Sequence, residues 1–212
     1  MKRDISILRR FAVAFAAVAI LATAAHAKPV TLRIDPSHMY VGFTAPHLGY
    51  SMSYGRFNDV KWQIVFDKDN VSVSKVMATI QTKSLDTNFQ ARDTYLRSAD
   101  FFDVEKHPTM TFVSTAIEKT GENTGRLTGN LTMLGDTKPV TLAVKFTRMA
   151  EQPLPAYKKV LTAGFSAQGK VKRSEFGMTK FLPAIPDEID IVINLEGARC
   201  EGEAAEAPSC KS

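Results

Sequence analysis

The chain has 212 residues, 44% of them hydrophobic, a formal net charge of +5 and two cysteines. Four basic residues and one acid among the first ten account for +3 of that charge, so the remainder carries only about +2. This near-neutral remainder lacks the basic patch that nucleic-acid binding requires. Without a Cys-x-x-Cys spacing, a thioredoxin-like redox site is also excluded.

Residues 1–27 predict a secretory signal peptide. A basic start precedes the apolar run 11–25, and Ala25-His26-Ala27 fits the small-x-small pattern of a cleavage site. The run is shorter than the roughly 20 residues that a membrane-spanning helix needs. We expect cleavage after Ala27, secretion to the periplasm and no integral membrane span in the mature chain. An uncleaved anchor is the alternative.

Hydrophobic and polar residues alternate with a period of two from Thr31 to Leu195. Turn signals, such as 67–70 and 134–139, separate these runs. About eight half-buried strands with almost no helix must cover one another, because nothing else can bury their apolar faces. The prediction is an all-β, single-domain fold over residues 28–198, in which the sheet covers itself as a sandwich or as a closed barrel. An eight-stranded barrel would have room inside for side chains or one ligand.

One helical segment, 88–98, interrupts the strand pattern. Asp86 or Thr87 can cap it, and Phe89, Tyr95 and Leu96 give it an apolar side. Because Phe101 and Phe102 follow closely, we expect this short helix to cap one end of the barrel. Asp93 and Arg97 have the spacing of an ion pair on the face of a helix.

Many aromatic residues fall at inward strand positions, which predicts a packed core. Small residues on the same faces, such as Ala78, Gly129 and Ala167, leave space that an apolar ligand can fill. The residues predicted to line such an apolar pocket are Phe43, Phe57, Trp62, Ile64, Phe66, Ile80, Tyr95, Phe101, Phe102, Phe112, Leu131, Leu142, Val144, Phe165 and Phe176.

Catalytic and metal-binding patterns are weak. The mature histidines occur in no metal-binding frame, and there is no G-x-S-x-G elbow or Gly-rich phosphate loop. We therefore predict no catalytic residue, no metal and no required cofactor. Charge complementarity instead nominates four side chains to meet the polar or phosphorylated head of a bound amphiphile. They are His47, Arg92, Arg97 and Arg173.

Residues 199–212 read as a flexible, acidic tail that contains both cysteines, Cys200 and Cys210. An even pair this close can form a small disulfide loop in an oxidising compartment. Free or intermolecular thiols are the alternative.

An ordered set of motifs gives the chain a family resemblance. These are His47-Leu48-Gly49-x-Ser51, Gly55-x-Phe57, Ser84-Leu85-Asp86-Thr87, Arg92-Asp93-x-x-Leu96-Arg97-Ser98-x-Asp100-Phe101-Phe102-Asp103, Gly129-Asn130-Leu131-Thr132, Gly164-Phe165 and Arg173-Ser174-Glu175-Phe176-Gly177. Together they resemble the YceI-like family of lipid-binding periplasmic proteins. The resemblance implies an extended eight-stranded antiparallel barrel over residues 28–198, with a lipocalin-like interior and a tunnel for a polyisoprenoid, quinone-like lipid or fatty amphiphile. It also implies a homodimer, and a carrier or sequestering protein that is not an enzyme.

Two other interpretations compete with this one. A lipid-modifying enzyme could use the same cavity, with Asp86, Asp93 and Asp103 as its candidate carboxylates. A small outer-membrane barrel shares the signal peptide and the alternation, but Lys61 and Lys145 at outward strand positions favour water outside the barrel.

Overall fold

The structure is a computed structural model that describes residues 28–211. The expected signal peptide and its cleavage site lie outside the described residues. The strands are β1 (Val30–His47), β2 (Ser51–Phe57), β3 (Val60–Phe66), β4 (Lys75–Gln81), β5 (Leu85–Asp86), β6 (Thr109–Lys119), β7 (Thr124–Met133), β8 (Asp136–Glu151), β9 (Leu161–Lys172) and β10 (Glu188–Ala198). The α-helices are α1 (Gln90–Arg97) and α2 (Pro208–Lys211).

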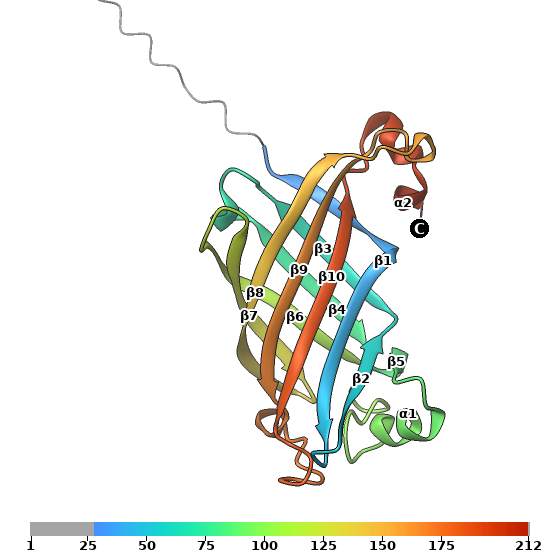
Figure 1. Ribbon diagram of the computed structural model, residues 1–212, viewed down its shortest axis with the longest axis vertical. Helices are drawn as coiled ribbons and strands as arrows, with labels where there is room; N and C mark the ends of the chain where they lie inside the picture. The colour runs from blue at the N-terminus through green and yellow to red at the C-terminus, as the bar shows by residue number, and fades with distance from the viewer. Residues whose placement is uncertain (1–27, 212) are drawn as a thin grey trace, which may run out of the picture.

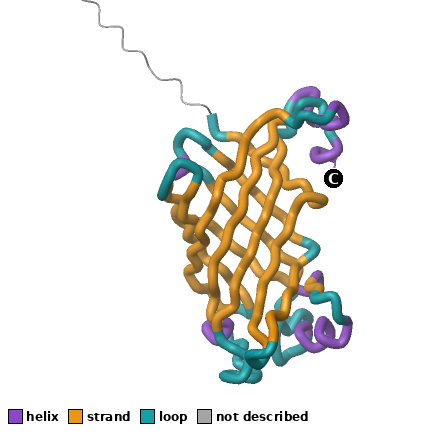
Figure 2. Tube along the Cα trace, viewed as in Figure 1, coloured by secondary structure: helices purple, strands orange, loops and turns teal. Residues whose placement is uncertain are grey.

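The strands form one antiparallel sheet that closes on itself because β1 pairs with both β3 and β10 (Figures 1 and 2). Two of the barrel's eight strands are interrupted. β2 and β3 both pair with β1, and only Asn58 and Asp59 separate them. β4 and β5 likewise pair with β3 and β2 on either side of a short 3-10 turn. The predicted all-β, eight-stranded antiparallel barrel is confirmed.

The barrel has two ends that differ in their connections. The α1 end holds the β1–β2 and β7–β8 turns, α1 and the connection from β9 to β10 (Figure 1). The disulfide end holds the β3–β4, β6–β7 and β8–β9 turns together with the C-terminal segment. None of the helices in the described chain is long and apolar enough to cross a bilayer.

Alternation fixes which way each strand faces. Along β3, Ile64 and Phe66 are buried while Lys61 and Gln63 are exposed. The same pattern in β8 buries Val140 and Leu142. Successive strand residues point to opposite faces, so one face of every strand turns toward the barrel axis.

A bulge in β1 changes its register with β10 between Ile34 and Met39. Within it, Asp35 accepts hydrogen bonds from the Ser37 backbone N–H at 2.9 Å and from the Ser37 hydroxyl at 2.6 Å. Burial would raise the pKa of Asp35, but the Ser37 hydrogen bonds and the nearby His38 ring outweigh it, so the pKa lies below its usual value. The bulge therefore stays polar inside an otherwise regular strand.

The C-terminal segment differs from the flexible tail predicted from the sequence. Cys200 and Cys210 form a disulfide with a Cα–Cα distance of 5.6 Å. Ala207 and Cys210 are buried against Val160 and Ala198 at the end of the barrel. The segment is packed because the bridge folds it back over a small apolar patch, which composition alone does not reveal.

α1 begins two residues later than predicted. Its N-cap residue is Phe89, in place of the predicted Asp86 or Thr87, and no side chain forms a capping hydrogen bond there. Instead, Asp93 accepts hydrogen bonds from the Thr87 N–H at 2.8 Å and the Thr87 hydroxyl at 2.5 Å. The predicted ion pair between Asp93 and Arg97 is wrong, because the Arg97 guanidinium donates to the Leu85 carbonyl. Both side chains join the helix to the strand before it.

Candidate ligand-binding cavity

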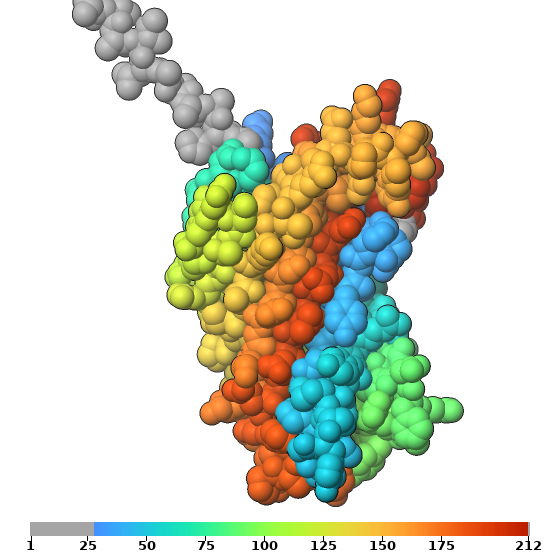
Figure 3. Space-filling model, in the orientation of Figure 1, coloured from blue at the N-terminus to red at the C-terminus, as the bar shows by residue number. Residues whose placement is uncertain are grey.

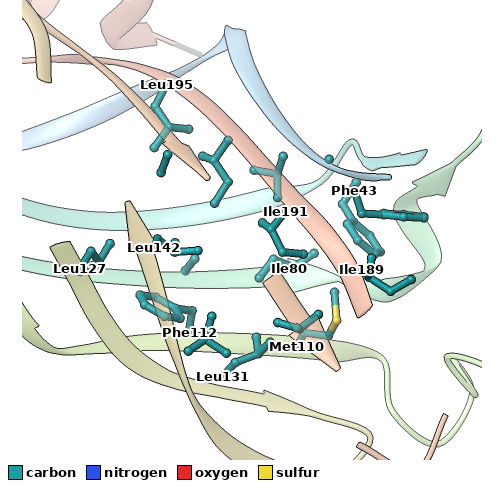
Figure 4. Close-up of a pocket in the computed structure, with 18 of the residues that line it drawn as sticks. Phe43, Ile80, Met110, Phe112, Leu127, Leu131, Leu142, Ile189, Ile191 and Leu195 are labelled. Atoms are coloured by element: carbon teal, nitrogen blue, oxygen red, sulfur yellow. The ribbon is translucent and has the colours of Figure 1, made fainter. Parts of the chain in front are cut away.

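A cavity of about 860 Å³ runs along the barrel axis. Its lining residues come from every strand except β5, as well as from α1 and the connections at both ends. Figure 4 shows apolar side chains from different strands, among them Phe43, Ile80, Leu127, Leu142 and Ile191, turned toward this common interior. Its volume falls in the range typical of pockets for small molecules.

Side-chain exposure shows that the interior is hollow. Inward-facing residues such as Trp62, Val144, Ile191 and Ile193 are only half-buried, although they line the barrel wall. In a solid core, such side chains would be surrounded by others and fully buried. The uncovered area belongs to the side of each residue that faces the axis.

Small residues contribute to this space less uniformly than the sequence predicts. Ala78 and Ala167 line the cavity as expected. Gly129 does not, since the Phe112 ring occupies the position above it and a Cβ added there would lie 2.3 Å from the ring. The Phe43 ring covers Gly55 in the same manner. These glycines let aromatic rings lie flat against the wall, so they widen the cavity indirectly.

Among the predicted apolar pocket residues, Phe176 alone lies outside the lining. It is 1% exposed and packs in the core beside the cavity. The other fourteen predicted residues all line the cavity, and their role in binding a ligand remains a proposal. They are Phe43, Phe57, Trp62, Ile64, Phe66, Ile80, Tyr95, Phe101, Phe102, Phe112, Leu131, Leu142, Val144 and Phe165. Sequence analysis missed Met110 and Met178, and it did not select Ile189, Ile191 and Ile193, whose alternation was visible.

The structure separates the four predicted polar contacts. His47 and Arg92 line the cavity at the α1 end, where His47 is exposed and Arg92 half-buried. The Arg92 guanidinium donates to the Thr87 carbonyl and hydroxyl, both at 2.8 Å. Arg97 lies outside the lining and donates to the Leu85 carbonyl.

Arg173 lies in the cavity lining, but its guanidinium forms hydrogen bonds within the fold. It is 3% exposed, and its three guanidinium nitrogens donate to the carbonyls of Met178, Ile185 and Pro186 at 2.8–3.1 Å. Burial lowers its pKa, while the charge of Asp187 opposes that shift. Arg173 therefore holds together the connection between β9 and β10. Neither Arg97 nor Arg173 is retained as a proposed head-group contact: Arg97 lies outside the cavity lining, and all three guanidinium nitrogens of Arg173 donate to backbone carbonyls.

The two mouths of the cavity differ chemically. At the α1 end the lining includes the exposed rings of Phe89 and Phe181. At the disulfide end it includes the exposed charged residues Lys68, Glu118 and Arg126, of which the last two form an ion pair at 3.3 Å. Sequence analysis missed this charged mouth because Lys68 lies in a turn and Glu118 and Arg126 lie near strand ends, where charged residues are common.

The carboxylates considered for catalysis lie elsewhere. Asp86, Asp93 and Asp103 are absent from the lining, and Asp93 is held by Thr87. Within residues 28–211 no group of three or more His, Cys, Asp or Glu side chains is arranged to hold a metal ion. The structure thus places none of these three carboxylates in the cavity.

Comparison with known sequences is consistent with this architecture. The profile of a YceI-like domain matches residues 32–197. The chain belongs to the YceI-like family. A UPF0312 protein of Pectobacterium carotovorum is 41% identical over 194 residues, which cover 91% of this chain and 98% of that protein. Protein YceI of Salmonella arizonae is 40% identical over 187 residues, covering 87% and 95%.

Solved structures also resemble this fold. BcnA of Burkholderia cenocepacia superposes with a TM-score of 0.69 at 25% identity, covering 77% of this chain and 98% of that one. A domain from Saccharophagus degradans, described as a polyisoprenoid binding domain implicated in plant cell wall breakdown, has a TM-score of 0.57 at 10% identity. The alignment covers 80% of this chain and 97% of that domain, and it shows a shared fold alone.

Proposed function

We propose that this YceI-like protein binds one long apolar chain, of isoprenoid or similar amphiphilic type, inside the barrel, and that it acts in the periplasm as a carrier or sequestering protein. The observation that carries the proposal is the cavity of about 860 Å³ with an apolar wall along its length. Burying an alkyl chain there is favourable by roughly 0.8 kcal/mol for each CH₂ removed from water.

The shape of the cavity supports a chain-like ligand over a compact one. Its lining extends from the β3–β4 and β6–β7 turns at one end to α1 and Phe181 at the other, so the space follows the barrel axis. The polyisoprenoid description of the Saccharophagus degradans domain adds a ligand class for a protein of this fold.

His47 and Arg92 are the proposed contacts for a polar end of the ligand. Both line the α1 mouth, and both can donate hydrogen bonds to a phosphate or hydroxyl group. The head group would then remain near the surface while the apolar chain occupies the barrel.

Identification of the co-purifying molecule tests the proposal. The mature chain is purified from the periplasm of its host without detergent, then analysed by native mass spectrometry and by organic extraction. We expect one apolar lipid per chain. Protein that is empty after this procedure, and that binds no added polyprenyl phosphate, would count against the proposal. The family resemblance also implies a homodimer, which sedimentation velocity would test.

A matched pair of variants tests the location of the ligand. Ala167→Phe places a ring in the cavity, whereas Ala116→Phe adds the same group at an exposed position of β6 outside the lining. We expect Ala167→Phe to reduce lipid retention by about tenfold or more and Ala116→Phe to leave it unchanged. Thermal unfolding of both variants checks that they fold. Equal retention in two folded variants would place the lipid elsewhere.

A further inference from the structure

Exposed apolar side chains gather at the α1 end. The apolar rim consists of Leu48, Tyr50, Tyr54, Phe89, Tyr95 and Phe181, which are 38–89% exposed. Met52 lies beside the rim on β2. Of the other exposed large hydrophobic residues of the described chain, Met77 and Val113 are a cross-strand pair on β4 and β6, and Val73 and Leu154 lie in separate connections. Clusters of this kind on a protein surface mark sites of interaction, whereas single exposed residues do not.

The rim residues come from three neighbouring segments at the α1 mouth of the cavity. Pairing of Thr44 with Asp190, and of Arg56 with Asp86, sets the β1–β2 hairpin between the segment before β10 and the segment before α1. Figure 3 shows this hairpin (cyan) between those two segments (orange-red and green). The rings of Tyr95 and Phe181 are 6.0 Å apart, which joins α1 to the β9–β10 connection.

Backbone conformation is a second, independent indication. Leu48 has φ of 52° and Phe181 has φ of 63°, in the left-handed region that suits Gly and Asn and disfavours bulky side chains. Both residues remain about half exposed, so packing within the chain does little to offset this cost. Among the seven described non-glycine residues with positive φ, only these two are exposed large hydrophobic residues, a combination that a contact outside the folded chain would explain.

The chemistry of the rim suits the surface of a lipid bilayer. Three of its six residues are tyrosines, whose amphipathic rings favour the boundary between apolar and aqueous phases. The Lys180 ammonium and the Arg92 guanidinium lie 5.7 and 5.8 Å from the ring centroids of Phe181 and Phe89, which sets cations beside the apolar groups at the level of lipid phosphates.

Neighbouring charges argue against a strongly charged protein partner. Lys180 pairs with Asp100 at 3.2 Å, and Arg56 lies 3.8 Å from Asp86, so positive and negative groups alternate around the rim. A surface without a dominant sign of charge offers little long-range attraction to a polyelectrolyte. Attachment through the rim must therefore depend mainly on burial of its apolar groups.

We propose that the apolar rim docks this protein on a phospholipid bilayer, with the α1 mouth of the cavity facing the membrane. Leu48 and Tyr50 at the hairpin turn, and Phe181 on the adjacent connection, enter the interfacial region of the bilayer. What the docking serves rests on the proposed function: an apolar chain moves between membrane and barrel without crossing water. The docking itself rests on the surface alone.

Vesicle flotation tests the proposal with the full mature chain. The probes are vesicles of phosphatidylcholine alone and of phosphatidylethanolamine with phosphatidylglycerol. We expect the protein to float with both, with little loss at high salt. Leu48→Asn combined with Tyr50→Ser lowers the bound fraction by about tenfold or more, because apolar burial is lost. Asn tolerates the left-handed conformation of residue 48, so the variant folds. Absence of wild-type binding overturns the proposal.

The matched control is Leu154→Ser, which removes an exposed leucine at the disulfide end (58% exposed). We expect it to float as the wild type does, and equal loss in the control would show that no specific surface is involved. Tyr50→Trp adds a reporter to a chain with one native tryptophan. Brominated lipids should quench it beyond the wild-type background and should not quench Leu154→Trp.

Two further measurements separate the alternatives. Sedimentation velocity shows whether the protein is a dimer. If the wild type does not bind vesicles, and its dimer dissociates in the Leu48 and Tyr50 double variant, the rim is assigned to contact with a second copy of the chain. Dansyl-undecanoic acid reports the cavity, and its affinity should be unchanged in the double variant. Vesicle binding without dansyl-undecanoic acid binding would contradict the proposed function and would still support the docking surface.

Discussion

The two ends of this barrel are built on different principles. The α1 end surrounds its mouth with exposed aromatic rings, and the buried Arg173 holds the connection from β9 to β10 there. The disulfide end surrounds its mouth with charged residues of a turn and of strand ends, and the Cys200–Cys210 disulfide fixes the C-terminal segment beside it. The barrel wall thus lies between a mouth suited to apolar contact and a mouth suited to water. We expect substitutions at one end to leave the structure of the other end unchanged.

Arg173→Met should give the largest effect and should act on the α1 end. The substitution keeps much of the side-chain volume but leaves the carbonyls of Met178, Ile185 and Pro186 without their donors. Because each buried unsatisfied group costs about 1–3 kcal/mol, we expect the free energy of unfolding to fall by about 3 kcal/mol or more. Chemical denaturation measures it, with the exposed Arg148→Met as control. A change below about 1 kcal/mol would refute the structural role assigned to Arg173.

Replacement of both Cys200 and Cys210 by serine should act on the disulfide end alone. The bridge closes a loop with a sequence separation of 10, and loop-closure entropy then predicts a loss of about 2.5 kcal/mol in the free energy of unfolding. We expect retention of the cavity's lipid to be unchanged, because no residue of the C-terminal segment lines it. Loss of lipid in the folded double variant would show that the two ends are coupled.

Gly129→Ala tests the wall between the ends. The added Cβ would lie 2.3 Å from the Phe112 ring and 2.6 Å from the Val113 carbonyl oxygen, so the ring must move toward the axis. We expect a destabilisation of about 1–3 kcal/mol and weaker lipid retention. Gly164→Ala is the control, since its nearest neighbour is Thr147 Cβ at 3.5 Å, an ordinary contact. Similar results for the two variants would contradict the role of glycine in widening the cavity.

Low pH should give the smallest effect of the four, a loss of stability at the α1 end. Ser174 donates its hydroxyl and its backbone N–H to the Asp187 carboxylate at 2.7 and 2.8 Å, which lowers the pKa of Asp187. A lowered pKa contributes stability that is present above the unfolded-state value of about 3.9 and is lost as pH falls through the folded-state pKa. We expect Asp187→Asn to flatten the decline of the unfolding free energy below about pH 4. An unchanged slope would exclude this contribution.

Strand alternation predicts a sheet that covers itself and most of the cavity lining, and the family resemblance selects a barrel over a sandwich. The period of two in residues such as Trp62, Ile64 and Phe66 fixes which face turns inward, whatever the exact pairing. The roles of Arg97 and Arg173 could not be predicted, because their partners are carbonyls in turns that no sequence pattern locates. Phe176 has the same apolar character as the lining residues, and only the three-dimensional path of the chain places it beside the cavity.

The middle of the cavity wall consists of carbon-rich side chains, and the Trp62 indole N–H there is already directed at the Met39 sulfur at 3.1 Å. A surface of this composition cannot tell one hydrocarbon from another by hydrogen bonding, and a single methylene changes affinity by only about 10- to 200-fold. Discrimination must come from girth, bends and length. Molecules of similar thickness will compete for the barrel, and their relative abundance around it will determine which one it holds.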